Sequence, residues 1–289
     1  MKEIVKEKIA SLLSGGEEIQ SVEQLGGMTN QNYLVKTSSN QYIVKFFGKG
    51  TDKLIDRQNE KFNLELLKDL KLDVENYLFD IDAGIKVNQY IENAETLDST
   101  TIKTKFEKIA PILQTIHASG KELKGEFAPF EEIKKYESLI QGEISYPNYE
   151  VVRKSVFSLK DQLEEIGMDK KSCHIDLVPE NFIEGPDGHL YLIDWEYSSM
   201  NDPMWDLAAL FLESEFTSAE EEDFLSHYES DKTPVSRDKI RIYKILQDII
   251  WSLWTIYKEE NGADFGDYGI SRYNRAVKEL DCEGDLDEN

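Results

Sequence analysis

Three short stretches near the amino terminus alternate apolar and polar residues, which is the pattern of strands with one buried face. We expect strands at residues 19–25, 32–37 and 41–47, and two more at 77–81 and 85–91, which turn residues separate. Residues 1–13 place their apolar side chains on one helical face, and the glycine pair behind them predicts the end of that helix. The amino-terminal part should therefore be an antiparallel sheet accompanied by helix.

From residue 93 onward the apolar residues follow a helical period instead, most clearly at 101–119 and 151–166. Asp202-Pro203 suits the cap and first turn of a helix, and Ser218 with Glu221 fits a capping box. This change of pattern predicts an α+β chain with two lobes. The first lobe, residues 1–92, would hold the sheet, and the larger second lobe, residues 93–289, would be mainly helical.

One stretch of the second lobe breaks the helical pattern. Within residues 173–196, apolar residues flank a Gly-Pro-Asp-Gly turn and predict a buried hairpin. Asp176, Asn181 and Asp194 lie in or beside this hairpin. Carboxylates held beside buried strands need a polar partner or a metal ion, so these residues are candidates for function.

The spacing His174-x-Asp176-x₄-Asn181 matches the catalytic loop of the kinase superfamily. In that loop the Asp orients and deprotonates a hydroxyl group, and the Asn holds Mg²⁺. Asp194, leaving the next strand, would supply the other Mg²⁺ contact through a hard oxygen ligand. The pattern indicates phosphoryl transfer from ATP, although His174 and Asn181 could also be loop residues that bond to backbone.

Two charged residues of the first lobe fit the nucleotide side of such a reaction. Lys45 ends a strand otherwise suited to a core, and Glu60 opens the helical stretch that follows. In kinases a strand lysine paired with a helix glutamate holds the α and β phosphates of ATP. Each residue alone would more commonly be a solvated surface charge.

The loop between the first two strands contains two adjacent glycines followed by small polar residues. It lacks the Gly-x-Gly-x-x-Gly of protein kinases, but its backbone N–H groups and the side chains of Thr29 and Asn30 could cover phosphates. A plain hairpin turn is the competing interpretation. By the same comparison, backbone around Tyr90 and Ile91 would meet adenine as a kinase hinge does, whereas periodicity alone makes this a strand end.

Composition narrows the class of protein further. The 289 residues carry 33 Lys and Arg against 57 Asp and Glu, and this net charge of −24 argues against a nucleic-acid partner. No run of eighteen apolar residues occurs and the first ten residues alternate in charge, so we expect neither membrane insertion nor export. Two cysteines form neither a disulfide framework nor a zinc quartet, which fits a reducing cytoplasm.

With these residues in this order, the chain resembles the small-molecule branch of the kinase superfamily, which contains choline and aminoglycoside kinases. Protein kinases usually have Lys where Val178 stands, Asp-Phe-Gly where Asp194-Trp195-Glu196 stands, and an Ala-Pro-Glu segment that is missing here. The resemblance implies a bilobal protein-kinase-like fold with ATP and Mg²⁺ as cofactors and no protein substrate.

The block that starts at Asp194, together with Trp251-Ser-Leu-Trp254, is similar to choline kinases, including the bacterial kind. A quaternary ammonium group cannot donate a hydrogen bond, so ring faces and carboxylates recognise it. The resemblance implies that choline is the substrate. It assigns choline contacts to Tyr197, Glu213, Trp251, Trp254 and Tyr268, and support of the catalytic loop to His174 and Asp206. Ile175 replaces an Asn that is common in the family's loop.

Other interpretations stay open at this stage. Two tryptophans on an apolar helix are more often core residues than ligand contacts. The acceptor could be ethanolamine, another amino alcohol or an aminoglycoside, since primary amines need carboxylates and carbonyls that accept their hydrogens. A non-catalytic pseudokinase conflicts with the intact Lys45, Asp176, Asn181 and Asp194. An acidic interaction module explains the charge but not the catalytic spacing.

Overall fold

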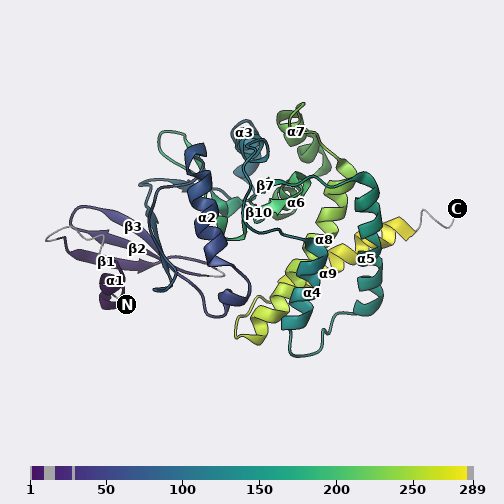
Figure 1. The fold of residues 1–289 in the computed structure, drawn as a ribbon, viewed down its shortest axis with the longest axis horizontal. Helices are drawn as coiled ribbons and strands as arrows, with labels where there is room; N and C mark the ends of the chain where they lie inside the picture. The colour runs from purple at the N-terminus through teal and green to yellow at the C-terminus, as the bar shows by residue number, and fades with distance from the viewer. Residues whose placement is uncertain (1, 10–16, 28–29, 285–289) are drawn as a thin grey trace. The chain divides into compact units, whose positions relative to one another are not determined.

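The computed structural model of the chain describes residues 2–9, 17–27 and 30–284 (Figure 1). Contacts divide the chain into two compact units. Unit 1 contains Met1–Thr101 and Pro179–Tyr197, and unit 2 contains Ile102–Val178 and Ser198–Asn289. The sequence predicts two continuous lobes that meet at residue 92. The two units differ from these lobes, because the segment Pro179–Tyr197 folds with unit 1.

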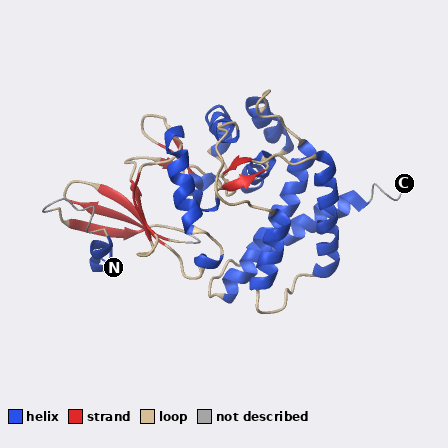
Figure 2. Cartoon of the chain, viewed as in Figure 1, coloured by secondary structure: helices blue, strands red, loops and turns tan. Residues whose placement is uncertain are grey.

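Unit 1 is built on a five-stranded antiparallel sheet with the order β1-β2-β3-β5-β4 (Figure 2). Its strands are β1 (Ile19–Gln24), β2 (Gln31–Thr37), β3 (Gln41–Phe46), β4 (Asn76–Asp80) and β5 (Ile85–Gln89). Each lies where alternation predicts a strand, apart from residues at the ends. The buried face carries Val35, Val44 and Val87, which pack with Val5 of α1 (Lys2–Lys8).

A helix and a second sheet complete unit 1. Helix α2 (Arg57–Leu67) starts where the Asp56 side chain accepts hydrogen bonds from two backbone N–H groups. The second sheet has the order β6-β8-β9, with β6 (Glu95–Thr96), β8 (Phe182–Glu184) and β9 (Leu190–Leu192). The β8–β9 hairpin confirms the Gly-Pro-Asp-Gly turn, in which Gly188 adopts a φ of 79° that favours glycine. Short 3₁₀ helices lie at Thr51–Lys53, Lys68–Leu70, Pro179–Asn181 and Trp195–Tyr197.

Unit 2 is mainly helical, and its helices pack around α8 (Arg237–Glu260). Helix α8 contacts α4 (Pro129–Leu139), α5 (Tyr149–Ile166), α6 (Pro203–Glu213) and α9 (Tyr268–Gly284), and Figure 1 shows α9 crossing beside it. Buried side chains cover most of its circumference, as a central helix requires. The remaining elements are a 3₁₀ turn at Ile102–Thr104, α3 (Phe106–His117), α7 (Ser218–Tyr228), and the strand pair β7 (Lys171–Cys173) and β10 (Ser199–Asn201).

Helix boundaries differ from the sequence predictions in several places. The helix expected over 101–119 begins only at Phe106, after the 3₁₀ turn, and the helix expected at 151 begins at Tyr149. The helix expected over 1–13 is described only at its start, because residues 10–16 lie outside the described part. Among the described residues, no helix combines the length and the apolar character needed to cross a bilayer.

The helix caps of unit 2 show how local geometry selects a residue. Asp202 caps α6 as predicted, and its side chain accepts from the backbone N–H of Met204 at 3.0 Å. The predicted capping box at the start of α7 is wrong by one residue, since Thr217 and Glu220 form it. Thr217 has an extended backbone (φ −72°, ψ 160°) that turns its hydroxyl toward the helix, whereas the neighbouring serine is already helical.

Candidate active site

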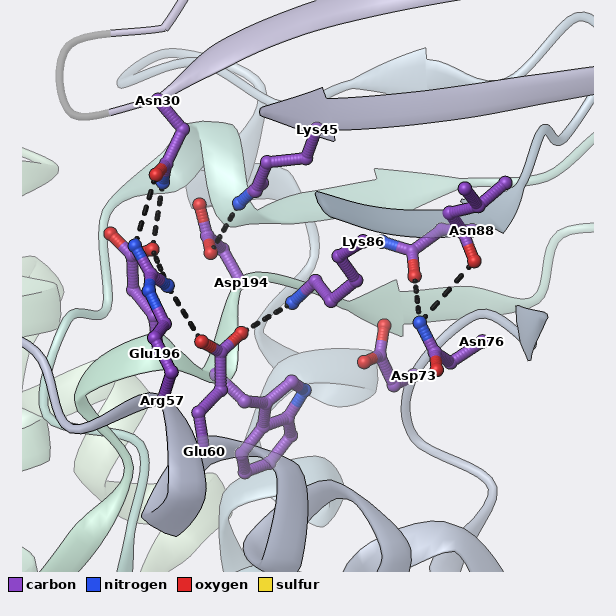
Figure 3. Close-up of polar contacts among 12 residues, drawn as sticks. Asn30, Lys45, Arg57, Glu60, Asp73, Asn76, Lys86, Asn88, Asp194 and Glu196 are labelled. Atoms are coloured by element: carbon purple, nitrogen blue, oxygen red, sulfur yellow. Dashed lines mark hydrogen bonds and ion pairs between the residues drawn. The ribbon is translucent and has the colours of Figure 1, made fainter. Parts of the chain in front are cut away.

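Two buried lysines lie on neighbouring strands of unit 1 (Figure 3). Lys45 on β3 is directly opposite Lys86 on β5, so their side chains lie on the same face of the sheet. Lys45 Nζ donates to Asp194 Oδ1 at 2.6 Å, and Lys86 Nζ donates to Glu60 Oε1 at 2.7 Å. A buried ammonium group needs such a partner, and here each lysine has its own carboxylate.

These contacts show that the predicted ion pair between Lys45 and Glu60 is wrong. Both oxygens of the fully buried Glu60 carboxylate are engaged, one by Lys86 and the other by Arg57 at 2.6 Å. Burial alone would raise the pKa of Glu60, but the charges of Lys86 and Arg57 outweigh it and lower this pKa. Lys45 pairs instead with Asp194, the residue that leaves the β8–β9 hairpin.

Arg57, the first residue of α2, joins three segments of unit 1 (Figure 3). Besides Glu60, its guanidinium donates to Glu196 Oε2 at 2.9 Å and to Asn30 Oδ1 at 3.0 Å. Asn30 Nδ2 in turn donates to Glu196 Oε2 at 2.7 Å. The loop after β1, the start of α2 and the segment after the hairpin are thereby tied together.

The predicted phosphate-binding loop is described only in part. Thr29 lies outside the described residues, and Asn30 is buried with both ends of its amide engaged within unit 1. Gly27 is required by close packing, because a Cβ there would lie 2.6 Å from the carbonyl oxygen of Asn30. The contact of Thr29 and Asn30 with nucleotide stays a prediction.

Lys86 and the carboxyl groups near it have shifted pKa values. Burial alone would lower the pKa of Lys86, but the charges of Glu60, Asp194 and Asp73 outweigh it and raise this pKa. Burial raises the pKa of Asp73 to about 7, against the opposing effect of the Lys86 charge. Burial, followed by the charge of Asp194, also raises the pKa of Glu196. Lys86 is therefore charged at neutral pH.

Asn181 and Asp194, the predicted Mg²⁺ ligands, belong to the same unit. The backbone carbonyl of Asn181 accepts from the N–H of Ile193 at 2.8 Å, so the two side chains start from neighbouring backbone. Asp194 adopts a φ of 67°, unusual for a residue other than glycine, and its side chain is 26% exposed. An amide oxygen and a carboxylate are hard ligands of the kind that Mg²⁺ prefers, so the residues present fit this ion.

Three further predicted contacts lie in unit 1. Tyr90 and Ile91 directly follow β5 and keep part of their surface exposed, which a hinge contact with adenine requires. The carbonyl of Ile91 accepts from the N–H of Ala94 at 3.3 Å. Tyr197 is buried in the last 3₁₀ turn of this unit, whereas the other predicted choline contacts belong to unit 2.

In unit 2, Asp206 on α6 holds the predicted catalytic loop. Its two carboxylate oxygens accept from the backbone N–H groups of His174 and Ile175, each at 2.8 Å. Trp205 Nε1 donates to the carbonyl of Ile175 at 3.0 Å. Ile175 has a φ of 79°, a strained conformation for a β-branched residue. These bonds fix the backbone immediately before Asp176.

His117 on α3 extends this support. Its Nε2 lies 3.0 Å from Asp206 Oδ2, and its Nδ1 lies 2.7 Å from the hydroxyl of Tyr228. Cys173 is buried nearby, and burial followed by the charge of Asp206 raises its pKa. His117, Cys173 and Asp206 place ligand atoms within 4.8 Å of one another, but the bonds from Asp206 to the loop backbone make this cluster a structural support.

Aromatic rings of unit 2 form a series from Trp251 to Tyr268. The ring centroids of Trp251 and Trp254 are 6.4 Å apart, those of Trp254 and Phe265 5.0 Å, and those of Phe265 and Tyr268 6.5 Å. Burial, followed by the negative charge of Asp176, raises the pKa of Tyr268. The predicted catalytic carboxylate therefore lies within electrostatic reach of the ring at one end of the series.

Glu213, at the end of α6, is paired with a cation that the sequence analysis did not single out. Arg272 of α9 donates to Glu213 Oε1 and, at 3.1 Å, to Asp248 Oδ1. The Cζ of Arg272 lies 4.8 Å from the ring centroid of Tyr268. Asp248 also accepts from Arg275 through both oxygens, at 2.6 Å each.

Among the residues that sequence reasoning missed are Arg57, Lys86, Glu196 and Arg272. Lys86 carries the same signal as Lys45, a charged residue between apolar neighbours in a strand, and a consistent use of that criterion would have found it. Arg57 and Arg272 stand among many charged helix residues, and no local pattern distinguishes them.

The two units thus offer different chemistry. Unit 1 brings two buried lysines together with oxygen ligands that suit Mg²⁺, and unit 2 brings a carboxylate near a series of aromatic rings. Phosphates need cations of the first kind, and an organic cation with a hydroxyl group needs surroundings of the second kind.

Comparisons with known proteins agree with this chemistry. The model of the choline/ethanolamine kinase family matches residues 22–240. The crystal structure of choline kinase LicA from Streptococcus pneumoniae is 77% identical, covers 98% of this chain and 99% of that chain, and has a TM-score of 0.95. A crystal structure of LicA in complex with AMP is 78% identical, covers 97% and 98% of the two chains, and has a TM-score of 0.92.

A more distant relative is protein LicA of Haemophilus influenzae, which is 32% identical over 269 residues, 89% of this chain and 79% of that protein. The predicted α+β, protein-kinase-like fold and the predicted kinase branch are confirmed by these similarities. The chain belongs to the choline/ethanolamine kinase family.

Proposed function

We propose that this protein transfers the γ-phosphoryl group of ATP to the hydroxyl group of choline, giving phosphocholine and ADP. Its family makes the chain an ATP-dependent phosphotransferase. The observation that carries the choice of acceptor is the series of aromatic rings from Trp251 through Trp254 to Tyr268, in the unit that also holds Asp176. A proton acceptor near ring faces suits an alcohol that bears a quaternary ammonium group.

On the acceptor side, Asp176 takes the proton of the choline hydroxyl group. At the same time, the hydroxyl oxygen of choline forms a bond to the γ-phosphorus of ATP. The bond from that phosphorus to the bridging oxygen breaks, and ADP leaves. Asp206 keeps Asp176 in position by holding the backbone of the two preceding residues. Such positioning lowers the barrier because the base need not be reoriented during the reaction.

On the donor side, Lys45 would hold phosphate oxygens, and Tyr90 and Ile91 would contact adenine through backbone groups. Asn181 and Asp194 would hold Mg²⁺, which supplies positive charge that neutralises the phosphates. Lys45 now contacts Asp194, so nucleotide binding would exchange this ion pair for contacts to phosphate. Glu60 and Arg57 support this side by fixing α2 and the segment of Glu196. A cytoplasmic location fits the proposal because ATP is supplied there.

The trimethylammonium group of choline would contact ring faces, from Trp251, Trp254, Tyr197 and Tyr268, with Glu213 contributing negative charge. Each desolvated cation–π contact is worth about 0.5–2 kcal/mol. Trp251 and Trp254 are 8% and 5% exposed, so each would present only an edge or part of a face to the ligand.

The test is an ADP-release assay in the presence of Mg²⁺ with choline, ethanolamine, an aminoglycoside and a serine-containing peptide as separate acceptors. We expect the highest kcat/KM with choline and no turnover of the peptide. Asp176→Asn keeps the size of the side chain but removes the base, so it should abolish turnover and retain ATP binding. Choline turnover at the level of the no-acceptor background would reject the proposal.

A further inference from the structure

A cation of the protein itself occupies the surroundings that choline's ammonium group would require. The guanidinium of Arg272 lies over the ring of Tyr268 and donates to the carboxylate of Glu213. Its side chain is only 5% exposed. Burial, together with the nearby charge of Arg275, lowers the pKa of Arg272 to about 9, which still leaves the guanidinium charged at neutral pH. The Glu213 carboxylate is therefore already engaged by a guanidinium before any substrate arrives.

The pairing of Glu213 with Arg272 affects two kinds of ammonium group differently. A primary ammonium has three N–H donors, and each needs an acceptor at hydrogen-bond distance when it leaves water. A quaternary ammonium has no donor, carries its charge on methyl groups and gains from ring faces such as that of Tyr268. A carboxylate already paired with a guanidinium is a poor hydrogen-bond acceptor for a second cation. The pairing therefore weakens binding of a primary ammonium group more than binding of a quaternary one.

We infer that Arg272 is a specificity-determining residue, which makes the substrate site prefer a quaternary over a primary ammonium by occupying Glu213. The inference rests on the proposed function, because it concerns the acceptor site of that reaction. Arg272 has a structural task as well, since it connects α9 to α6 through Glu213 and to α8 through Asp248. If Arg272 had only this structural task, its replacement would lower kcat/KM for choline and for ethanolamine in equal proportion.

The neighbouring Arg275 provides a matched control. It lies on the same helix and also pairs with Asp248, but its side chain is 42% exposed and it donates to both oxygens of Asp248. Removing Arg275 therefore takes away a cation of the same kind without freeing Glu213. Removing Arg272 frees Glu213, while Asp248 keeps its two bonds to Arg275.

The experiment measures kcat/KM for choline and for ethanolamine on the same preparation of each variant, so the ratio does not depend on the folded fraction. Arg272→Met and Arg272→Gln should raise the ethanolamine-to-choline ratio about tenfold, or about 1.4 kcal/mol at 25 °C. Arg272→Lys, which keeps the charge, and Arg275→Met should leave the ratio within about twofold of the wild type. Glu213→Gln added to Arg272→Met should abolish the gain.

The outcomes separate the two claims. A wild-type enzyme that fails to phosphorylate choline would overturn the proposed function and this inference together. A wild-type choline kinase whose ratio is unchanged in both Arg272→Met and Arg272→Gln would overturn the inference alone. The same follows if Arg275→Met raises the ratio as much as Arg272→Met, or if the gain persists when Glu213 is replaced. If Arg272→Met does not fold, Arg272→Gln decides, because its amide can keep a bond to Asp248 although the guanidinium that occupies Glu213 is gone.

Discussion

Replacing Glu60 by Gln removes a charge that two cations of unit 1 share. Arg57 keeps the carboxylate of Glu196, but Lys86, 2% exposed, loses the carboxylate that it contacts. A buried charge without its partner costs about 3–5 kcal/mol. At about 2–4 °C per kcal/mol for large domains, the melting temperature of Glu60→Gln should fall by about 6–20 °C.

The identity of the partner can be tested by a second substitution in the Glu60→Gln background. Adding Lys86→Met removes the stranded ammonium group, so the double variant should regain about 1–3 kcal/mol relative to Glu60→Gln. Adding Lys45→Met should give no such gain, because Lys45 contacts Asp194 and not Glu60. The effects of Lys45→Met and Glu60→Gln should then add within about 0.5 kcal/mol.

The assay is urea unfolding followed by circular dichroism without nucleotide, which gives the free energy of unfolding of each variant. Hydrogen exchange by mass spectrometry adds location, since Glu60→Gln should speed exchange in β5 and leave α8 of the other unit unchanged. A gain in stability on adding Lys45→Met, with none on adding Lys86→Met, would refute the assignment of Glu60 to Lys86.

Three further predictions concern single residues. Trp254→Ala should raise the KM for choline about 2–30-fold, as loss of one cation–π contact implies, and leave the KM for ATP nearly unchanged. If the variant and the wild type have equal KM values for choline, Trp254 is a core residue and not a choline contact. Asp206→Asn can no longer accept equally from both loop N–H groups, so kcat should fall by up to about 100-fold with little change in either KM in steady-state assays; a change confined to KM would contradict this role. Because the pKa of Asp73 is raised to about 7, the folded state binds its proton more tightly than the unfolded state, and this residue makes stability fall as the pH rises from about 4 to 7. Asp73→Asn should remove that loss and be about 1–2 kcal/mol more stable than wild type at pH 8 but not at pH 4, because solvent screens the partly exposed Asp73 and keeps the gain small. Melting curves at the two pH values check it, and equal differences at both would contradict it.

The sheet of unit 1 could be predicted closely because strand alternation depends on neighbouring residues alone. Each strand buries one face, so β2 and β3 follow directly from the positions of residues such as Val35 and Val44. Helix starts were less predictable, since several residues in a row can cap a helix and the backbone angles decide among them. The hydroxyl of Thr217 caps α7, although the adjacent serine and glutamate have the same spacing in sequence.

The pairing of Lys45 shows a different limit. Sequence spacing can indicate that a strand lysine and a helix glutamate belong to one site, but it does not give the strand register. Register places Lys86 directly opposite Lys45, so two cations of the same sheet face were available to one glutamate. Glu60 forms its ion pair with Lys86, and Asp194 at the end of the hairpin forms its ion pair with Lys45. Candidate residues such as Lys45 and Asp194 could be proposed one by one from the sequence, whereas their partners followed from the three-dimensional arrangement.

The catalytic loop combines both situations. The spacing from His174 to Asn181 was sufficient to propose Asp176 as the catalytic base, because the residues of such a loop lie close together in the sequence. What keeps Asp176 in position comes from α6, where Asp206 and Trp205 bind the backbone around Ile175. The replacement of a common Asn by Ile175 seemed of little consequence in the sequence, yet its φ of 79° is one that Asn tolerates and a β-branched residue resists. The hydrogen bonds from α6 must offset that strain, so the loop of this enzyme depends on Asp206 more than a loop with Asn at this position would.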